Sequence, residues 1–272
     1  WQVGRLIHPI NTLDLETPLD NEIYEELTPL LQRIDQQNKQ KDLVAQMRKE
    51  FSANVSHELK TPLTSISGYA EIMKDGLVRP EDMKGFSERI YHEAKRLITL
   101  VEDIIKLSRL DEGVVELEKK EVDLYDLTRE ICSRLASNAS ARHVHVEMTG
   151  EPVMFRGVRQ VLDEMLYNII DNAIKYNKEN GSVSVWVGTT LQGKKVIVQD
   201  TGIGIPKDEV ERIFERFYRV DKSHSKETGG TGLGLSIVKH GALMHDIKIH
   251  VDSEVGKGTR MELTFADKKE SA

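Results

Sequence analysis

The stretch FSANVSHELKTPLTSI, residues 51–66, places His57 directly before Glu58 in a helix-forming segment. Val55 and Leu59 belong to a row of apolar residues that recur at helical spacing along this segment. His57 lies two residues from each of them, which is about 200° around a helix. We therefore expect the histidine to point away from the apolar face, toward solvent.

An exposed imidazole in this position can take part in chemistry. With a reference pKa near ~6.5, the neutral ring has a free lone pair at neutral pH and can act as a nucleophile. Glu58 can hold or accept the proton on the other ring nitrogen. Pro62 has no N–H for the carbonyl of Glu58, so we expect the helix to kink or loosen there, at a local cost of about 3 kcal/mol. On these residues alone, Pro62 is either an ordinary kink or a hinge beside a reactive residue.

The helical pattern extends outward from this stretch, from about Lys39 to Leu110, with the turn segment KDGLVRPED dividing it into two helices. Two amphipathic helices cannot bury both faces as a simple hairpin, so we expect a dimer that forms a four-helix bundle. The alternative is a hairpin packed on the C-terminal part of the chain. The apolar rows are Leu43, Met47, Phe51, Val55, Leu59, Ile66, Ala70 and Met73, then Phe86, Ile90, Ala94, Leu97, Val101 and Ile104.

Composition narrows the class of protein. The chain has 272 residues, a net charge of −7 and 31% charged residues, which is enough length for two domains. Acidic and basic residues are interspersed without a basic stripe, which argues against nucleic acid as a partner. Cys132 is the single cysteine, so neither an internal disulfide nor a thiolate metal cluster can form, as is typical of a reducing cytosol. No apolar run approaches the ~18 residues that a membrane helix needs.

Residues 1–38 contain three of the seven prolines and are predicted to form a turn-rich linker that runs into a helix. The chain begins at Trp1 in WQVGRLIHPI, where an aromatic and a basic residue occur together, as they often do where a membrane helix ends. That start is either the exit of a membrane helix or arbitrary.

Beyond residue 111, short β-rich runs alternate with helices and glycine-rich loops. In DEMLYNIIDNAIKYN, residues 163–177, one helix face is apolar and the opposite face carries Glu164, Asn168, Asn172 and Lys175. Asparagine is a poor helix former. Two asparagines one turn apart therefore suggest oxygen ligands for a hard cation, with Lys175 placed for phosphate.

Two glycine-rich loops follow. VIVQDTGIGIP runs a strand into a loop, and the Asp200 carboxylate at the strand end can accept the amino group of a base. In GGTGLGLSIVK, residues 229–239, glycines precede a helix, so that free N–H groups can bind phosphate. The spacing matches neither the P-loop nor the Rossmann fingerprint.

The ordered set of motifs resembles the sensor histidine kinases of two-component systems. SHELKTPL resembles their H-box, NIIDNAIKY their N-box, DTGIGIP and GGTGLGLSIVK their two glycine boxes, and FERFYR their F-box. The resemblance covers roughly residues 40–265 and implies an α+β protein. A dimeric antiparallel helical hairpin, a four-helix bundle in the dimer, would be followed by an α/β sandwich ATP-binding domain. The implied boundaries are a linker at 1–38, a phosphotransfer domain at 39–111 and a catalytic domain at 112–268.

The resemblance also implies roles for individual residues. His57 would be the phosphoacceptor, Glu58 its base partner, and Thr61 a residue that helps to remove phosphate from the response regulator. Asn172 would hold Mg²⁺, and Asp200 would hold the adenine amino group. Residues 214–226 would form a mobile ATP lid. The remaining nucleotide contacts would come from Glu164, Asn168, Lys175, Tyr176, Gly202, Gly204, Gly230, Thr231, Gly232, Leu233 and Gly234.

The implied cofactors are ATP and Mg²⁺, and the implied partners are a receiver domain and a second copy of the chain. The protein would be the cytoplasmic portion of a membrane sensor, anchored through a part that precedes this sequence. Two departures from the family pattern are visible: Asp246 stands where glycine is common, and residues 1–38 only loosely match a HAMP module. A functional alternative is a nucleotide-gated conformational ATPase without phosphohistidine, related in fold to Hsp90, gyrase and MutL. Those relatives lack the H-box.

Overall fold

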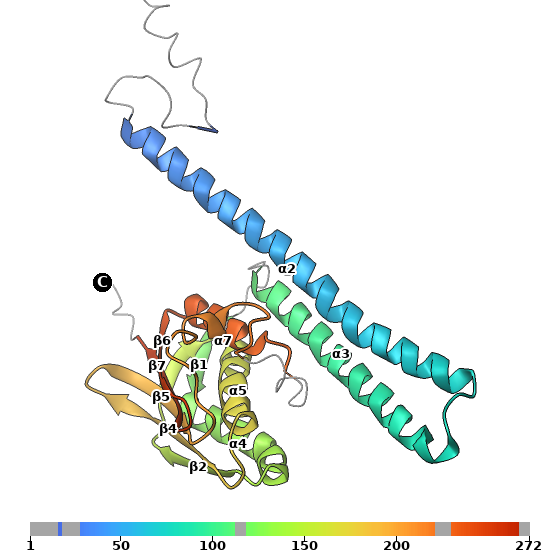
Figure 1. Cartoon of the computed structure of the whole chain (residues 1–272). Helices are drawn as coiled ribbons and strands as arrows, with labels where there is room; N and C mark the ends of the chain where they lie inside the picture. The colour runs from blue at the N-terminus through green and yellow to red at the C-terminus, as the bar shows by residue number, and fades with distance from the viewer. Residues whose placement is uncertain (1–15, 18–27, 112–117, 221–229, 267–272) are drawn as a thin grey trace, which may run out of the picture. The chain divides into compact units, whose positions relative to one another are not determined.

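The computed structural model describes residues 16–17, 28–111, 118–220 and 230–266 (Figure 1). The chain divides into two compact units, residues 1–61 and 62–272, and each is described by itself. In the described part of the chain, no helix is both long and apolar enough to span a bilayer.

Helix α2, Thr28–Lys74, is 47 residues long and continues through Pro62 without a break. The loosening expected beside the proline therefore does not end the helix. The helix begins well before Lys39. Pro29 is compatible with this start, because it falls in the first turn, where a missing N–H costs no hydrogen bond.

Helix α3, Met83–Asp111, follows a single 3₁₀ turn at Pro80–Asp82. Within residues 62–272 the two helices meet near the turn, where the rings of Tyr69 and Phe86 pack edge to face at 5.5 Å. The hairpin of the sequence analysis is therefore present. Several large apolar side chains of the single chain stay more than 40% exposed, namely Leu43, Val44, Met47, Leu63, Tyr91, Ile98, Val101 and Ile105.

The remainder of the second unit is built on a five-stranded sheet of order β2-β4-β5-β7-β6, with a separate two-stranded sheet, β1-β3. In the larger sheet β2 pairs parallel with β4, and the other pairs are antiparallel. The strands are β1 Lys120–Asp123, β2 His145–Gly150, β3 Met154–Gly157, β4 Ser182–Thr190, β5 Gly193–Asp200, β6 Ile247–Glu254 and β7 Gly258–Phe265.

One face of this sheet is covered by helices α4, Leu124–Ala141, α5, Arg159–Lys175, and α7, Gly234–Met244 (Figure 1). Alternate residues of β4, β5 and β7 point into a single core shared with these helices, because strand side chains alternate between the two faces. That core includes Val183, Val185, Val187, Val196, Val198, Met261, Leu263 and Phe265 from the strands, and Leu127, Ile131, Met165, Leu166 and Ile170 from the helices. The layered α+β arrangement predicted from the sequence is confirmed.

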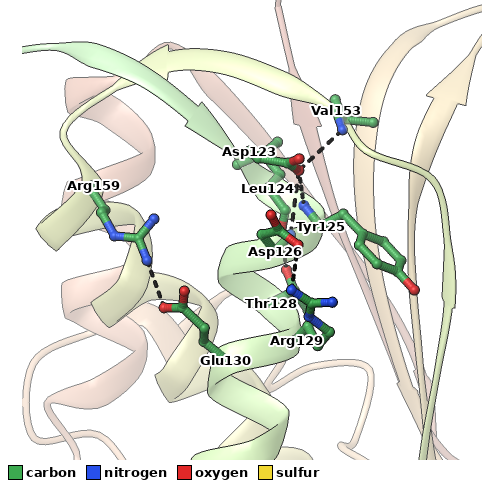
Figure 2. A network of polar contacts seen from close by, with 9 residues as sticks. All are labelled: Asp123, Leu124, Tyr125, Asp126, Thr128, Arg129, Glu130, Val153 and Arg159. Carbon is green, nitrogen blue, oxygen red and sulfur yellow. Dashed lines mark hydrogen bonds and ion pairs between the residues drawn. The ribbon is translucent and has the colours of Figure 1, made fainter.

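Asp123 joins the small sheet to the first helix of this core (Figure 2). Its Oδ1 accepts the backbone N–H of Tyr125 at 2.9 Å, as an N-cap residue does, and also that of Val153 at 3.4 Å. Farther along α4, Glu130 accepts a hydrogen bond from Arg159 at 2.6 Å, which ties α4 to α5. The second of these contacts involves Arg159, the first residue of α5, which is the helix that carries the polar face described above.

Asp246 occupies the turn before β6 with φ +55°, a conformation in which glycine is the least strained residue. The aspartate that departs from the family pattern thus sits at a left-handed position, and the turn is retained.

Candidate functional site

A pocket of about 860 Å³ lies in the second unit and is bordered by the polar face of α5. The end of β5 and the loop that enters α7 complete its wall. Among the residues singled out from the sequence, those lining it are Glu164, Asn168, Asn172, Lys175, Tyr176, Asp200, Gly204, Gly230, Thr231, Gly232 and Gly234. Residues from three distant motifs thus surround one cavity.

A hydrogen bond within α5 orients the Asn168 side chain. Asn168 donates its amide N–H to the carbonyl of Glu164 at 2.8 Å, so its Oδ1 lies on the side of Gly234. A Cβ atom at Gly234 would come within 2.5 Å of that oxygen. The start of α7 therefore approaches α5 at the level of Asn168.

Positive charge gathers at the other end of this face. Burial lowers the pKa of Lys175, as do the nearby cations Arg142 and Arg219, whereas Asp171 raises it. Arg142 donates to the carbonyl of Lys175 at 3.2 Å, and the ammonium lies 5.6 Å from the centre of the Tyr176 ring. Cations held in a partly buried pocket attract an anion more strongly than they would in bulk water, because the local dielectric constant is lower.

Asp200, the last residue of β5, places a carboxylate at the pocket wall, in contrast to the cations around Lys175. Its Oδ1 accepts backbone N–H groups from Gly202 at 2.8 Å and Thr259 at 3.2 Å. Burial raises its pKa, and these two hydrogen bonds partly offset that rise. Two backbone donors thus fix the orientation of the carboxylate at the pocket wall.

The loop after Asp200 is pressed against the end of α5. Ile203 donates its N–H to the carbonyl of Tyr176 at 3.1 Å. A Cβ atom at Gly202 would overlap that same carbonyl oxygen and would come within 2.9 Å of the Asp200 carboxylate. Gly202 is therefore required by close approach, although it does not itself line the pocket.

The glycine loop before α7 closes another side of the pocket. A Cβ at Gly230 would lie 3.1 Å from both the Lys175 ammonium and the Tyr176 hydroxyl. Leu233, the N-cap residue of α7, is fully buried, so this end of the loop is anchored in the protein interior. Of the expected ATP lid at 214–226, residues 221–226 lie outside the described residues, so its prediction stays open.

Four residues of α3 also line this pocket within the second unit, namely Thr99, Glu102, Asp103 and Lys106. Thr231 donates to Asp103 at 2.6 Å, and Lys106 pairs with Glu164 at 3.2 Å. Burial raises the pKa of Glu164, and Lys106 opposes that rise. Glu164, predicted to contact nucleotide, is thus engaged by a lysine of the helical hairpin.

Sequence reasoning missed Arg142 and Thr259. Arg142 follows α4 and Thr259 lies in β7, each more than 30 residues from the motif residue that it contacts. No local pattern marks either of them, because their place depends on how the helices and strands pack.

The first unit holds His57, Glu58 and Thr61 on α2. The His57 side chain is 79% exposed, which confirms that it points away from the apolar row, and its Nδ1 lies 4.0 Å from Oε1 of Glu58. Thr61 donates its hydroxyl to the carbonyl of His57 at 3.2 Å. That bond is made along the helix, one turn back from Thr61.

The donor chemistry of the pocket fits magnesium held mainly by phosphate. In the described part of the chain, no cluster of three or more His, Cys, Asp or Glu residues could bind a metal by itself. Asn172 lines the pocket on the same α5 face as Lys175 and offers an amide oxygen. Mg²⁺ commonly takes one or two protein oxygens and completes its shell with water and phosphate.

Comparisons with known proteins agree with this geometry. Residues 157–269 match the histidine kinase-, DNA gyrase B-, and HSP90-like ATPase family, and residues 47–113 match the His Kinase A (phospho-acceptor) domain. The fold and site thus define an ATPase domain of this class joined to a phosphoacceptor domain.

Individual relatives point the same way. The sensor histidine kinase WalK of Bacillus subtilis is 38% identical over 238 residues, which cover 83% of this chain and 38% of that protein. The phosphate regulon sensor protein PhoR of Pseudomonas aeruginosa is 36% identical over 224 residues, which cover 81% of this chain and 50% of that protein. The solved structure of the histidine kinase ThkA with the response regulator TrrA aligns with a TM-score of 0.64 and 25% identity, covering 85% of this chain and 65% of that one.

The chain belongs to the sensor histidine kinases of two-component systems. It spans about half the length, or less, of the two curated relatives just described. The predicted family is confirmed.

Proposed function

We propose that this chain is the kinase portion of a sensor that uses ATP to phosphorylate His57 and then passes the phosphoryl group to an aspartate of a response regulator. The observation that carries the proposal is the convergence of Asn168, Lys175 and Asp200 on one pocket, in a chain that also displays an exposed histidine. A site with an adenine acceptor at one wall and cations at another suits ATP.

The first step needs a free lone pair on the ring of His57. Glu58 lies beside Nδ1, at a distance that a small rotation of either side chain would shorten to a hydrogen bond. Glu58 then takes the Nδ1 proton while Nε2 attacks the γ-phosphorus. A P–N bond forms, the bond to the β–γ bridging oxygen breaks, and ADP leaves with that electron pair.

Catalysis of such a step depends on positioning and on neutralising charge. Lys175, with Arg142 beside it, faces the place where phosphate charge would lie, and the loop from Gly230 to Gly234 offers backbone N–H groups there. Magnesium, when bound, would neutralise phosphate charge, and Asn172 is the residue proposed to hold it.

The second step gives the phosphoryl group to a partner. An aspartate oxygen attacks the phosphorus, and the P–N bond breaks with its electron pair going to Nε2. The proton held by Glu58 returns to the ring, so His57 recovers its neutral form. The kinase ThkA, whose fold this chain shares, was solved together with a response regulator, which supports a receiver domain as partner. Thr61, one turn beyond His57, is proposed to orient water for the reverse task of dephosphorylating that regulator.

Dimerisation is part of the proposal. The match to the phosphoacceptor domain supports it, as does the exposed apolar surface of α2 and α3. A second copy would cover these side chains in a four-helix bundle. Attachment of the full-length protein to a membrane, through a segment outside this chain, also remains a proposal.

Incubation with γ-labelled ATP and Mg²⁺ tests the kinase assignment. We expect label on the protein that is stable to base and labile to acid, as a phosphoramidate is. His57→Ala should abolish this label while nucleotide binding persists, and His250→Ala, at an exposed position on β6, should keep it. ATP hydrolysis without any protein label would instead support the conformational ATPase, and normal labelling of His57→Ala would exclude His57 as the acceptor.

A further inference from the structure

Helices α5 and α7 pack directly on each other and run in opposite directions, as three contact levels show. Near the pocket, Gly234 approaches Asn168. About two turns farther along α7, a Cβ at Gly241 would lie 2.5 Å from the sulfur of Met165 and 2.9 Å from Val161. These close contacts leave little room between the two helices at the first two levels, and the third level adds directional hydrogen bonds.

His245 forms the third level, where α7 ends and α5 begins. Val158, the N-cap residue of α5, donates its backbone N–H to Nε2 of His245 at 2.9 Å. Nδ1 lies 2.9 Å from the carbonyl of Gly241. Because a backbone N–H can only donate and a carbonyl can only accept, Nε2 must be the bare nitrogen and Nδ1 must carry the proton. The neutral ring thus accepts a hydrogen bond from the backbone at the start of α5 and donates one to a backbone carbonyl of α7.

The surroundings of this ring are mostly apolar. His245 is 5% exposed, its ring lies 6.2 Å from that of Phe155, and Cδ2 would meet a Cβ at Gly157 at 3.1 Å. Among the described residues, the charged groups that act on the ring are Lys119, whose ammonium donates to the carbonyl of Met244, and Asp246.

We propose that His245 is a proton-sensitive positioning residue that fixes the sliding register of α7 against α5, and thereby the spacing of the two helix faces that would hold nucleotide. It touches neither the pocket nor its contents and acts through the helices. The inference rests on the proposed binding of ATP, because nucleotide affinity is what the register would control.

Protonation would reverse the fit of one bond. The imidazolium carries a proton on Nε2, which would then face the N–H of Val158, donor against donor. The ring would have to leave its place, and the end of α7 would lose its hold on α5. Gly234 and Asn168, at the far end of the same pair, would then shift relative to each other.

The direction of the pH effect follows from the burial. Burial lowers the pKa of His245, and Lys119 lowers it further, while the Gly241 carbonyl and Asp246 oppose this. The neutral ring is therefore favoured in the folded protein relative to the unfolded one. The contribution of the neutral ring to the free energy of unfolding is complete above the ordinary histidine pKa of about 6.5. It is lost as the pH falls through the lowered pKa of His245 in the folded protein.

Binding of ADP and Mg²⁺ to the full chain, measured by calorimetry from pH 7.5 to pH 5, tests the inference. His245→Gln keeps an acceptor for Val158 without a titrating group, His245→Leu removes both bonds, and His250→Gln changes an exposed histidine as a control. Protonation of the ADP phosphates is common to all proteins, so it cancels in ratios of dissociation constants.

We expect three results. At pH 7.5, His245→Leu should bind ADP about tenfold more weakly at unchanged far-ultraviolet circular dichroism, while His245→Gln stays within about threefold of the parent chain. Between pH 7.5 and pH 5, the dissociation constant of the parent should rise about tenfold relative to that of His245→Gln. The ratio of the parent to His250→Gln should stay constant. The protection factor of the Val158 amide against hydrogen exchange should fall in acid in both of these proteins, which keep His245, but not in His245→Gln.

Parallel pH curves for the parent and His245→Gln would overturn the inference and leave the proposed function intact. So would parent-like ADP binding by folded His245→Leu. A parent chain that binds no ADP at pH 7.5 would refute the proposed function, and the inference with it.

Discussion

Replacement of Asp200 by Asn is a sharp test of the pocket, because the two backbone donors dictate how the new amide must lie. Gly202 and Thr259 both donate to Oδ1 of Asp200, at 2.8 Å and 3.2 Å. An asparagine would place its carbonyl oxygen at that position to keep both bonds. Its NH₂ group is then forced into the place of the second carboxylate oxygen, so a donor stands where an acceptor stood.

The expected loss can be worked from this exchange. If the second oxygen accepts the adenine amino group, the variant sets donor against donor, and a buried polar group left unpaired costs about 1–3 kcal/mol. That range corresponds to roughly 5- to 150-fold weaker ADP binding. Fold stability should change little, because the bonds to Gly202 and Thr259 persist.

A change of the nucleotide base distinguishes a direct contact with Asp200 from a general loss of affinity. Hypoxanthine presents a carbonyl where adenine presents its amino group, so IDP should suit the asparagine better than the aspartate. Calorimetry with both nucleotides should show that the preference for ADP over IDP falls at least tenfold in Asp200→Asn. Asp252→Asn, on the exposed surface of β6, removes the same charge and should keep the parent preference. An unchanged ADP affinity together with an unchanged ADP-to-IDP ratio would show that Asp200 does not contact the base.

Three other outcomes are expected. Thr61→Ala should leave labelling of His57 and transfer intact but slow the loss of phosphate from a purified phospho-regulator in the presence of ADP, and equal decay rates would leave Thr61 as a structural residue of α2 only. Gly202→Ala should weaken ADP binding at least tenfold, because its Cβ would push the loop off the Tyr176 carbonyl, and parent-like binding would contradict that contact. Lys195→Met should destabilise the second unit by about 1–3 kcal/mol in urea unfolding, because Glu262 would lose its 2.5 Å partner in a pair that is 8% and 15% exposed and would keep only its 3.2 Å contact with Arg260. Adding Glu262→Leu should restore much of that loss, and an additive second loss would argue against the pair.

Much of the site could be anticipated from the sequence, because its key signals are local. The step of four residues between Asn168 and Asn172 fixes both on one helix face whatever the helix packs against. Asp200 follows a run of apolar strand residues and precedes glycines, so the sequence also predicts that it lies at the end of a strand. The exposure of His57 follows from its angular distance from Val55 and Leu59, and the structure agrees.

Other features depend on which elements pack together. Residues 1–38 were predicted to form a turn-rich linker that runs into a helix, and helix α2 starts at Thr28 within that segment. The sequence did not give this starting residue, because prolines are tolerated in a first turn and local propensity marks helix ends poorly.

Only the tertiary structure brings Arg142 to Lys175, Thr259 to Asp200 and His245 to Val158. These partners come from separate elements of the fold, and a sequence pattern with the period of one helix or strand carries no information about such pairs. The sequence by itself determined which residues share a face, since that follows from backbone geometry. The meeting of those faces was decided by burial of a common core, a property of the whole folded chain.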